Sequence, residues 1–332
     1  MNNRVVWKGC LKREILSFTL FLMVFFFCAA LGYPASQPLK EVRIASSTTV
    51  SFTNLSTFYA RDRGFFEKEG LDVKIIVVQT NAALAALVTG NVDYTTLSTS
   101  AIEAALKGMP VRLVAVTSQQ PVWGLVVRKG ISSVAQLKGK KIAVSSYGGT
   151  SYAAMLYVLK HYGLNPKDVT ILATGETVSR IAALKNESVD AAIIAAPGDM
   201  KAVAIGDFKI LLDVGPIYRL PMGGLSTSLR KIKENPAEIK RVVQAVVRAT
   251  RFIVDPANKD EVLKYLAGGF KLERNVAEEL YRRVVPSFSP TGMVDGDKIK
   301  LVIDSAVERG VTNKSVEPDA VVDFSFAREA GF

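Results

Sequence analysis

The sequence predicts an α/β protein of two similar lobes, because one structural pattern occurs twice along the chain. Leu84–Leu87 and Gly90–Asp93 align without a gap on Ile181–Leu184 and Glu187–Asp190, at an offset of 97 residues. Around each copy, short β-branched runs alternate with stretches of helical spacing, as in mainly parallel sheets covered by helices. Two similar lobes imply a cleft between them, and a cleft is where a ligand would bind.

The first copy is predicted from apolar runs separated by loops and helix caps. Residues 73–78 form an almost continuous β-branched run, which is typical of a buried parallel strand. Gly70 closes a helical stretch that begins near Leu55, and Asn81 can cap the next helix. We expect strands at 42–45, 73–78, 93–97 and 112–116, and helices at 55–69, 82–89 and about 99–107.

The second copy follows the same order, and the chain then becomes helical. Asn165-Pro166 starts a turn, and Asn235-Pro236 is a good cap and first-turn pair for a helix. The helical tail needs a partner to cover, and lobe 1 is the natural one. We expect strands at 141–144, 169–172, 190–194 and 208–212, and helices at 152–162, 179–185, 236–254, 260–267, 275–285 and 297–309.

The domain boundaries follow from this order. Lobe 1 is expected to comprise residues 40–123 and 224–332, and lobe 2 residues 124–223. The chain would then cross between the lobes twice, near Gly124 and near Gly223-Gly224. Paired crossings rich in glycine suit a hinge, although two ordinary linkers without motion are the alternative.

Residues 1–32 predict a cleaved secretory signal peptide, and hence a periplasmic protein. Four basic residues precede an uncharged run that is densest from Phe18 to Leu31, and Pro34 follows it. An uncleaved anchor is the alternative, but the run is short for a membrane span of about 20 residues. Cys28 would suit a lipoprotein, although Phe27 before it is bulky for such a cleavage site.

Composition excludes several classes of function. Both cysteines, Cys10 and Cys28, lie in the leader, and His161 is the one histidine, near a helix end. A Cys/His zinc site is therefore excluded, and no metal, cofactor or catalytic residue is expected. Removal of residues 1–32 lowers the formal net charge from +11 to +8. That charge is spread along the chain, so we expect no nucleic-acid partner, while small anions remain suitable ligands.

Hydroxyl groups and small residues follow the predicted strands in four loops, at 46–49, 97–100, 145–151 and 195–198. Such loops line the ligand crevice of an open α/β sheet, and the helices they begin present free N–H groups to an anion. Ordinary helix capping explains any one of these hydroxyls equally well. Phe52 is a wall or core residue, and Gln119 offers amide donors at the lobe junction. The candidate ligand-binding residues are Ser46, Ser47, Thr48, Phe52, Ser98, Thr99, Gln119, Ser146, Gly148, Gly149, Thr150 and Pro197.

Four segments resemble the solute-binding proteins of nitrate, sulfonate, taurine and thiamine-precursor ABC importers: Arg63–Val73, Gly90–Asp93, Val134–Val144 and Tyr162–Val169. The resemblance covers about residues 40–325. It implies a type II periplasmic-binding-protein fold that closes over one small ligand and delivers it to a membrane permease with its ATPase. It also implies pocket positions in the first serine loop, the 97–100 loop and the Gly148-Gly149 loop. The chain lacks a Cys-rich motif like that of the thiamine-precursor synthases sharing this fold.

The sequence therefore predicts a monomeric, exported, non-enzymatic receptor for a small anionic organic solute. A sulfonate, nitrate, taurine or a pyrimidine or aromatic acid would fit this class. Two alternatives stay open: a lyase or dehydratase on the same scaffold, and a ligand-sensing module for a receptor kinase.

Overall fold

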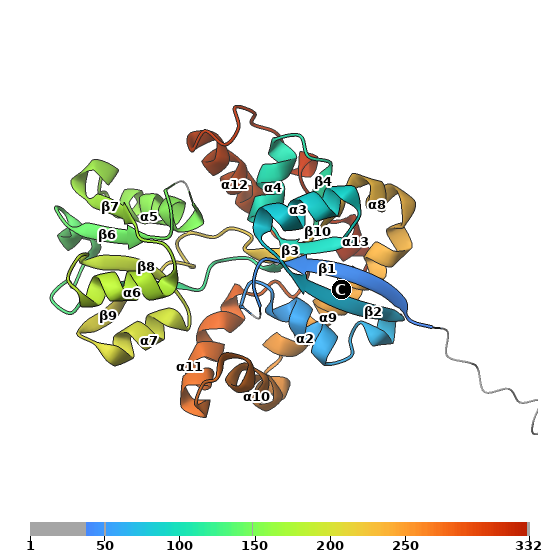
Figure 1. Cartoon of the computed structure of the whole chain (residues 1–332), viewed down its shortest axis with the longest axis horizontal. Helices are drawn as coiled ribbons and strands as arrows, with labels where there is room; N and C mark the ends of the chain where they lie inside the picture. The colour runs from blue at the N-terminus through green and yellow to red at the C-terminus, as the bar shows by residue number, and fades with distance from the viewer. Residues whose placement is uncertain (1–37, 50, 148, 331–332) are drawn as a thin grey trace, which may run out of the picture. The chain divides into compact units, whose positions relative to one another are not determined.

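The computed structural model describes residues 38–49, 51–147 and 149–330, and they contain two five-stranded sheets (Figure 1). The predicted signal peptide, residues 1–32, lies outside the described residues. In sheet A, β1 pairs in parallel with β2 and β3, whereas β10 pairs antiparallel with β3 and β4. Its strand order is β2 (Leu71–Val77), β1 (Lys40–Ser46), β3 (Tyr94–Leu97), β10 (Gly223–Ser228) and β4 (Val111–Ser118).

Sheet B repeats this arrangement strand for strand. Its β6 pairs in parallel with β7 and β8, and β5 pairs antiparallel with β8 and β9. The prediction of two similar α/β lobes is thus confirmed. The order is β7 (Thr170–Ala173), β6 (Lys141–Val144), β8 (Ala191–Ala195), β5 (Trp123–Arg128) and β9 (Phe208–Asp213).

Four of the five strands in each sheet run in the same direction, as expected of mainly parallel sheets, and one strand runs antiparallel to them, so the sheets are mixed. The sequence did not indicate β5 and β10, which are the strands that the chain enters directly after each crossing. Each inserts antiparallel between two strands of the sheet it joins. Their glycines concealed them, since glycine weakens a strand signal.

Gly223 and Gly224 are buried within β10, where neighbouring backbone leaves no room for a side chain. A Cβ on Gly223 would lie 1.6 Å from the carbonyl oxygen of Thr53, and one on Gly224 would lie 2.0 Å from that of Ala115. Close packing therefore explains these glycines. Hinge motion at the crossings stays a prediction.

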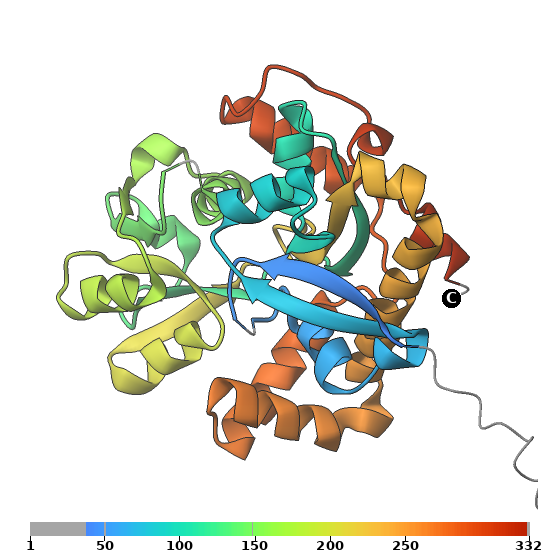
Figure 2. The same ribbon diagram turned by 45° about the vertical axis from the view of Figure 1, so that its right-hand side comes forward.

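Helices cover both faces of each sheet, as Figures 1 and 2 show. On sheet A, α3 (Thr80–Thr89) and α4 (Thr99–Leu106) pack on one face, and α2 (Leu55–Asp62) and α9 (Pro236–Val254) on the other. On sheet B, α5 (Thr150–His161) covers one face, and α6 (Thr177–Lys185) and α7 (Gly198–Ile205) the other. The helix expected at 55–69 ends early, because Gly64 adopts a left-handed φ of 72°.

The C-terminal helices pack on lobe 1, as expected. Helix α9 contacts α2, α12 contacts α4, and α13 contacts α9 and β4. These later helices are α8 (Leu229–Glu234), α10 (Lys259–Phe270), α11 (Arg274–Val284), α12 (Gly296–Glu308) and α13 (Ser325–Glu329). The 3₁₀ turns are η1 (Glu67–Glu69), η2 (Val134–Leu137), η3 (Pro166–Asp168), η4 (Pro256–Asn258), η5 (Val285–Ser287) and η6 (Pro318–Ala320).

The repeated Val-Asp motif ties β1 to the start of β3 in sheet A, and β6 to the start of β8 in sheet B. The Asp93 N–H donates to the carbonyl of Arg43 over 2.8 Å, and the Arg43 N–H donates back to the Asp93 carboxylate over 2.8 Å. Asp190 and Lys141 make the same pair of bonds in sheet B, at 2.8 and 2.9 Å. In each sheet the carboxylate thus adds one hydrogen bond to the strand pairing, just before β3 or β8 begins. Because both sheets need this bond, the Val-Asp motif occurs twice.

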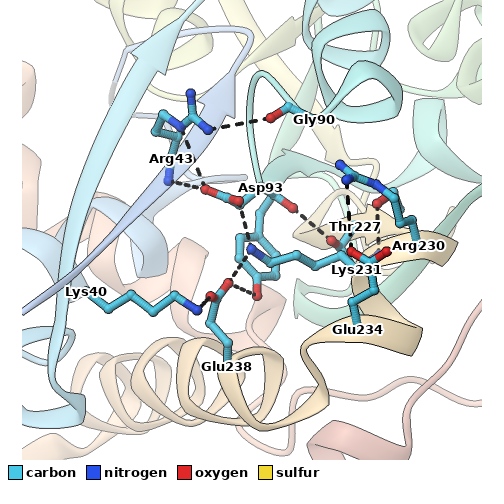
Figure 3. Close-up of polar contacts among 11 residues, drawn as sticks. Lys40, Arg43, Gly90, Asp93, Thr227, Arg230, Lys231, Glu234 and Glu238 are labelled. Atoms are coloured by element: carbon cyan, nitrogen blue, oxygen red, sulfur yellow. Dashed lines mark hydrogen bonds and ion pairs between the residues drawn. The ribbon is translucent and has the colours of Figure 1, made fainter.

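In lobe 1, Asp93 also belongs to a buried charge cluster (Figure 3). Lys231 of α8 places its ammonium 2.7 Å from Asp93 and 2.6 Å from Glu238 of α9. The Tyr94 hydroxyl donates to Glu238 over 3.0 Å, and Lys40 of β1 pairs with the same carboxylate. One buried glutamate therefore joins β1, β3, α8 and α9.

Burial acts to raise the pKa of Glu238, but hydrogen bonds from Lys231 and Lys40 outweigh it and hold that pKa below its usual value. A depressed pKa in the folded state stabilises the fold above the unfolded-state pKa of about 4.3. That contribution is lost as the pH falls through the folded-state value. The cluster is thus an acid-sensitive part of lobe 1.

We expect Glu238→Gln to lower the free energy of unfolding at pH 7 by about 3 kcal/mol, because Lys231 and Lys40 lose a buried counter-ion. Urea unfolding followed by circular dichroism measures this change. The wild-type advantage should shrink between pH 5 and pH 3, since protonation removes the same charge.

Glu234→Gln is the matched control, because Glu234 pairs with Arg230 on the surface of α8 over 3.9 Å. This change should cost less than about 0.5 kcal/mol. Equal losses for the two variants at pH 7 would contradict the role assigned to Glu238.

Candidate functional site

A small cavity lies where β1 and β3 end and the loops after them begin. It has a volume of about 130 Å³. Eight of its eleven lining residues carry a hydroxyl group, and none of these lining residues is charged. They are Ser47, Thr48, Thr53, Asn54, Thr96, Leu97, Ser98, Thr99, Ser100, Thr150 and Met222.

The lining comes from both halves of the molecule. Most of it belongs to the loops that follow the strands of sheet A, whereas Thr150 is the first residue of α5, which covers sheet B. Met222 lies in the second crossing, where its N–H donates to the carbonyl of Ser118 over 2.8 Å. A ligand in this cavity would therefore touch both lobes and the segment that joins them.

Asn54 organises the first serine loop. It is 2% exposed, and its amide nitrogen donates to the Ser46 hydroxyl and to the Thr49 carbonyl, each over 3.0 Å. Its amide oxygen accepts the Ser51 N–H over 2.7 Å. The Thr96 hydroxyl also reaches Ser46, over 3.1 Å. This network fixes the loop from within and leaves Ser47 and Thr48 to line the cavity.

Ser98 carries a hydroxyl that the described part of the chain does not satisfy. It is 2% exposed, and its Oγ has no hydrogen-bond partner among the described residues. The neighbouring Thr99 hydroxyl, by contrast, donates to the carbonyl of Pro221 over 2.8 Å. A buried hydroxyl without a partner is costly, and that Ser98 donates to a ligand stays a prediction.

Three helices begin at the cavity: α2 after Asn54, α4 after Ser98 and α5 after Gly149. None of these three preceding residues caps its helix with a side-chain hydrogen bond. The first N–H groups of a helix have no acceptor within it and carry partial positive charge. The cavity therefore combines hydroxyl donors with helix ends that favour an anion.

Five predicted site residues line this cavity: Ser47, Thr48, Ser98, Thr99 and Thr150. Ser46 lies behind them in the Asn54 network. Their contact with a ligand stays a prediction, supported by their convergence from loops about 50 and 100 residues apart in sequence.

The other predicted residues do not line it. Phe52 stacks on Phe270 with ring centroids 4.8 Å apart, in the hydrophobic core. The Gln119 amide donates to the Phe288 carbonyl over 3.1 Å, which fixes the first crossing. Four predicted residues remain. Ser146 is exposed, and Gly148 lies outside the described residues. Gly149 directly precedes α5, and Pro197 follows a cis peptide bond and directly precedes α7.

Sequence reasoning missed Thr53, Asn54, Thr96 and Met222. Thr96 was hidden because it lies inside a strand, and Met222 because it lies in a crossing. Asn54 could have been found, since an asparagine directly before a helix is a common cap.

Catalytic and metal-binding groups are not gathered at this site. His161 lies at the far end of α5 from Thr150, roughly 16 Å away along the helix. Within residues 38–49, 51–147 and 149–330, no group of His, Cys, Asp and Glu could hold a metal ion. The same residues contain no helix long and apolar enough to cross a membrane.

Two mixed α/β lobes of this topology define the periplasmic-binding-protein fold. The periplasmic sulfonate-binding protein SsuA of Methylobacillus flagellatus has this structure with a TM-score of 0.75, at 22% identity, over 89% of this chain and 94% of that one. Residues 52–259 match the NMT1/THI5 like family, and the chain belongs to that family.

Curated relatives of this family are of two kinds. A protein of Brucella abortus named as a binding protein is 26% identical over 270 residues, which is 79% of this chain and 80% of the relative. The 4-amino-5-hydroxymethyl-2-methylpyrimidine phosphate synthase THI11 of Saccharomyces cerevisiae is 25% identical over 260 residues, 71% of this chain and 73% of the enzyme.

We expect Asn54→Ala to lower the free energy of unfolding by about 2 kcal/mol, because the loop acceptors and the Ser51 N–H lose buried partners. Amide hydrogen exchange of residues 46–49 should accelerate in the same variant. Asn91→Ala is the control, since Asn91 is exposed and its side chain bonds, among the described residues, to Thr89 over 3.1 Å. Unchanged exchange in Asn54→Ala would show that another contact holds the loop.

Proposed function

We propose that this protein is the substrate-binding component of an ABC importer and captures a small anionic organic solute between its two lobes. The observation that carries the proposal is the cavity itself. It combines eight hydroxyl-bearing residues with the uncapped starts of three helices. Such a site neutralises an anion by hydrogen bonds and helix dipoles.

The cavity chemistry favours an oxyanion over a cation. No carboxylate lines it, and the chain beyond residue 32 carries a formal net charge of +8. A sulfonate, nitrate, taurine or a pyrimidine or aromatic acid falls within this class. The similarity to SsuA, a sulfonate-binding protein, and to the binding protein of Brucella abortus supports the same class.

The proposal includes a cellular setting. Residues 1–32 act as a cleaved leader, the mature protein works as a periplasmic monomer, and its partners are a membrane permease and the ATPase of that permease. Lobe 1 comprises residues 40–123 and 224–332, and lobe 2 residues 124–223. The start of β5 at Trp123 and of β10 at Gly223 supports these boundaries.

An enzymatic role is the competing proposal, because THI11 of yeast is a synthase. The side chains of this chain argue against it. Both cysteines precede residue 29, and the single histidine lies at the end of α5 opposite the cavity. The residues around the cavity offer hydrogen bonds but no base or nucleophile activated by a partner. We therefore propose binding without turnover.

The test is a ligand screen on the mature protein. Methanesulfonate, taurine, nitrate, benzoate and inorganic phosphate are tested by thermal shift and calorimetry, with X-ray scattering for compaction. At least one anion should raise the melting temperature and reduce the radius of gyration. A screen without binding would overturn the proposal, and conversion of a bound compound seen by mass spectrometry would favour the enzyme.

Thr150→Asp should weaken binding of the same anion about tenfold or more, because it places a carboxylate in the wall of the cavity. The helix itself tolerates this change, since an acidic residue suits a helix start. Thr80→Asp is the control, as Thr80 begins α3 in the same way without lining the cavity. The affinity of the Thr80→Asp variant for that anion should equal the affinity of the wild type.

A further inference from the structure

Arg180 of α6 is a buried arginine with most of its guanidinium unpaired. It is 6% exposed, and its Nη2 donates to the hydroxyl of Thr177 over 3.1 Å. Its Nε and Nη1 have no hydrogen-bond partner among the described residues. Three N–H donors therefore point at no acceptor in the part of the chain that the structure describes.

This arrangement is costly unless another group completes it. A buried charge without a counter-ion loses its hydration and gains nothing in return. Burial lowers the pKa of the Arg180 guanidinium, and only the charge of Glu176 opposes that change. By contrast, the buried Arg283 of α11 lies 2.7 Å from Asp199 and 2.6 Å from Asp213. Among the described residues, Arg283 thus has two ion-pair partners, whereas Arg180 has none.

Arg180 lies near the edge of sheet B at which the parallel strands β6, β7 and β8 end. Helix α6 follows β7, and the Gly175 N–H before it donates to the carbonyl of Ser145 in the loop after β6. Helical side chains lean toward the helix start, and the bond to Thr177 shows that Arg180 does so.

The start of α6 also adjoins the loop after β8. A Cβ on Gly198, the first residue of α7, would lie 2.6 Å from the Thr177 methyl group. The guanidinium therefore lies where β7 and β8 end. The parallel strand β6 ends at the same edge, and Thr150, which lines the cavity, follows it.

We propose that Arg180 binds the anionic group of the solute and supplies the formal positive charge that the hydroxyl-lined cavity lacks. This inference rests on the solute-binding function proposed above. Its ligand class is an oxyanion, namely a carboxylate, sulfonate or phosphate group, because such a group accepts several N–H donors at once. Lobe 1 would hold the solute by hydroxyls and helix ends, and lobe 2 would hold its charge.

If Arg180 binds the solute, its replacement should change ligand affinity without lowering stability, whereas replacement of a structural arginine should lower stability. If Arg180 is kept for a ligand, Arg180→Met removes an uncompensated buried charge, and the melting temperature of the ligand-free protein should stay the same or rise. The affinity for an anionic solute should fall about tenfold or more, because charge-assisted hydrogen bonds are lost. Arg180→Lys should lie between the wild type and Arg180→Met.

Arg128→Met is the matched control. Arg128 ends β5 of sheet B, which α6 covers, and also has an unpaired Nε, but it pairs with Glu187 over 3.2 Å and donates to the Leu184 carbonyl over 3.4 Å. It lies at the end of β5 opposite Trp123, the end away from the crossing. Its replacement should lower the melting temperature and leave the affinity for anions unchanged.

The experiment measures melting temperature without ligand and calorimetric affinity for methanesulfonate, benzoate and inorganic phosphate, on the wild type and the three variants. The proposal is overturned if the wild type binds an anion and Arg180→Met binds it equally well, or if Arg180→Met loses stability without losing affinity. Failure of the wild type to bind any of these anions would instead reject the solute-binding function, and this inference with it.

Discussion

A carboxylate at the amino edge of each sheet fixes the strand pairing on which the site depends. Asp93 exchanges two hydrogen bonds with the backbone of β1, and Asp190 exchanges two with the backbone of β6. Because a strand is rigid along its length, a register fixed at one edge also fixes where the loops leave the other edge. The hydroxyl-bearing loops are therefore positioned by residues at the opposite edge of each sheet.

The two crossings tie the lobes together more firmly than simple linkers would. Each crossing ends in a strand that inserts antiparallel between two strands of a sheet. The backbone hydrogen bonds of that sheet therefore depend on the position of the crossing. The crossings also contact each other, since Met222 bonds to Ser118 and Gly215 lies against Pro121. Any relative motion of the lobes must then arise in the short segments between these strands, near residues 119–122 and 214–222.

The distribution of buried charge differs between the lobes. In lobe 1, Lys231 lies between two carboxylates, and its cluster holds the tail helices on the sheet. In lobe 2, Arg180 hydrogen-bonds to a hydroxyl and to no carboxylate among the described residues. A satisfied network supports a fold, whereas the open donors of Arg180 suit the anionic ligand proposed above.

The sequence by itself determined the two-lobe architecture, the strands at residues 42–45 and 141–144, and the serine-rich loops after them. These features depend on local pattern, because periodicity and caps are properties of neighbouring residues. Only the tertiary structure decided that β5 and β10 are strands and that Asn54 and Met222 meet Thr150 at one cavity. It also decided that Phe52 belongs to the core and that Arg180 is buried without a counter-ion. Those outcomes depend on contacts between distant segments, which local sequence does not specify.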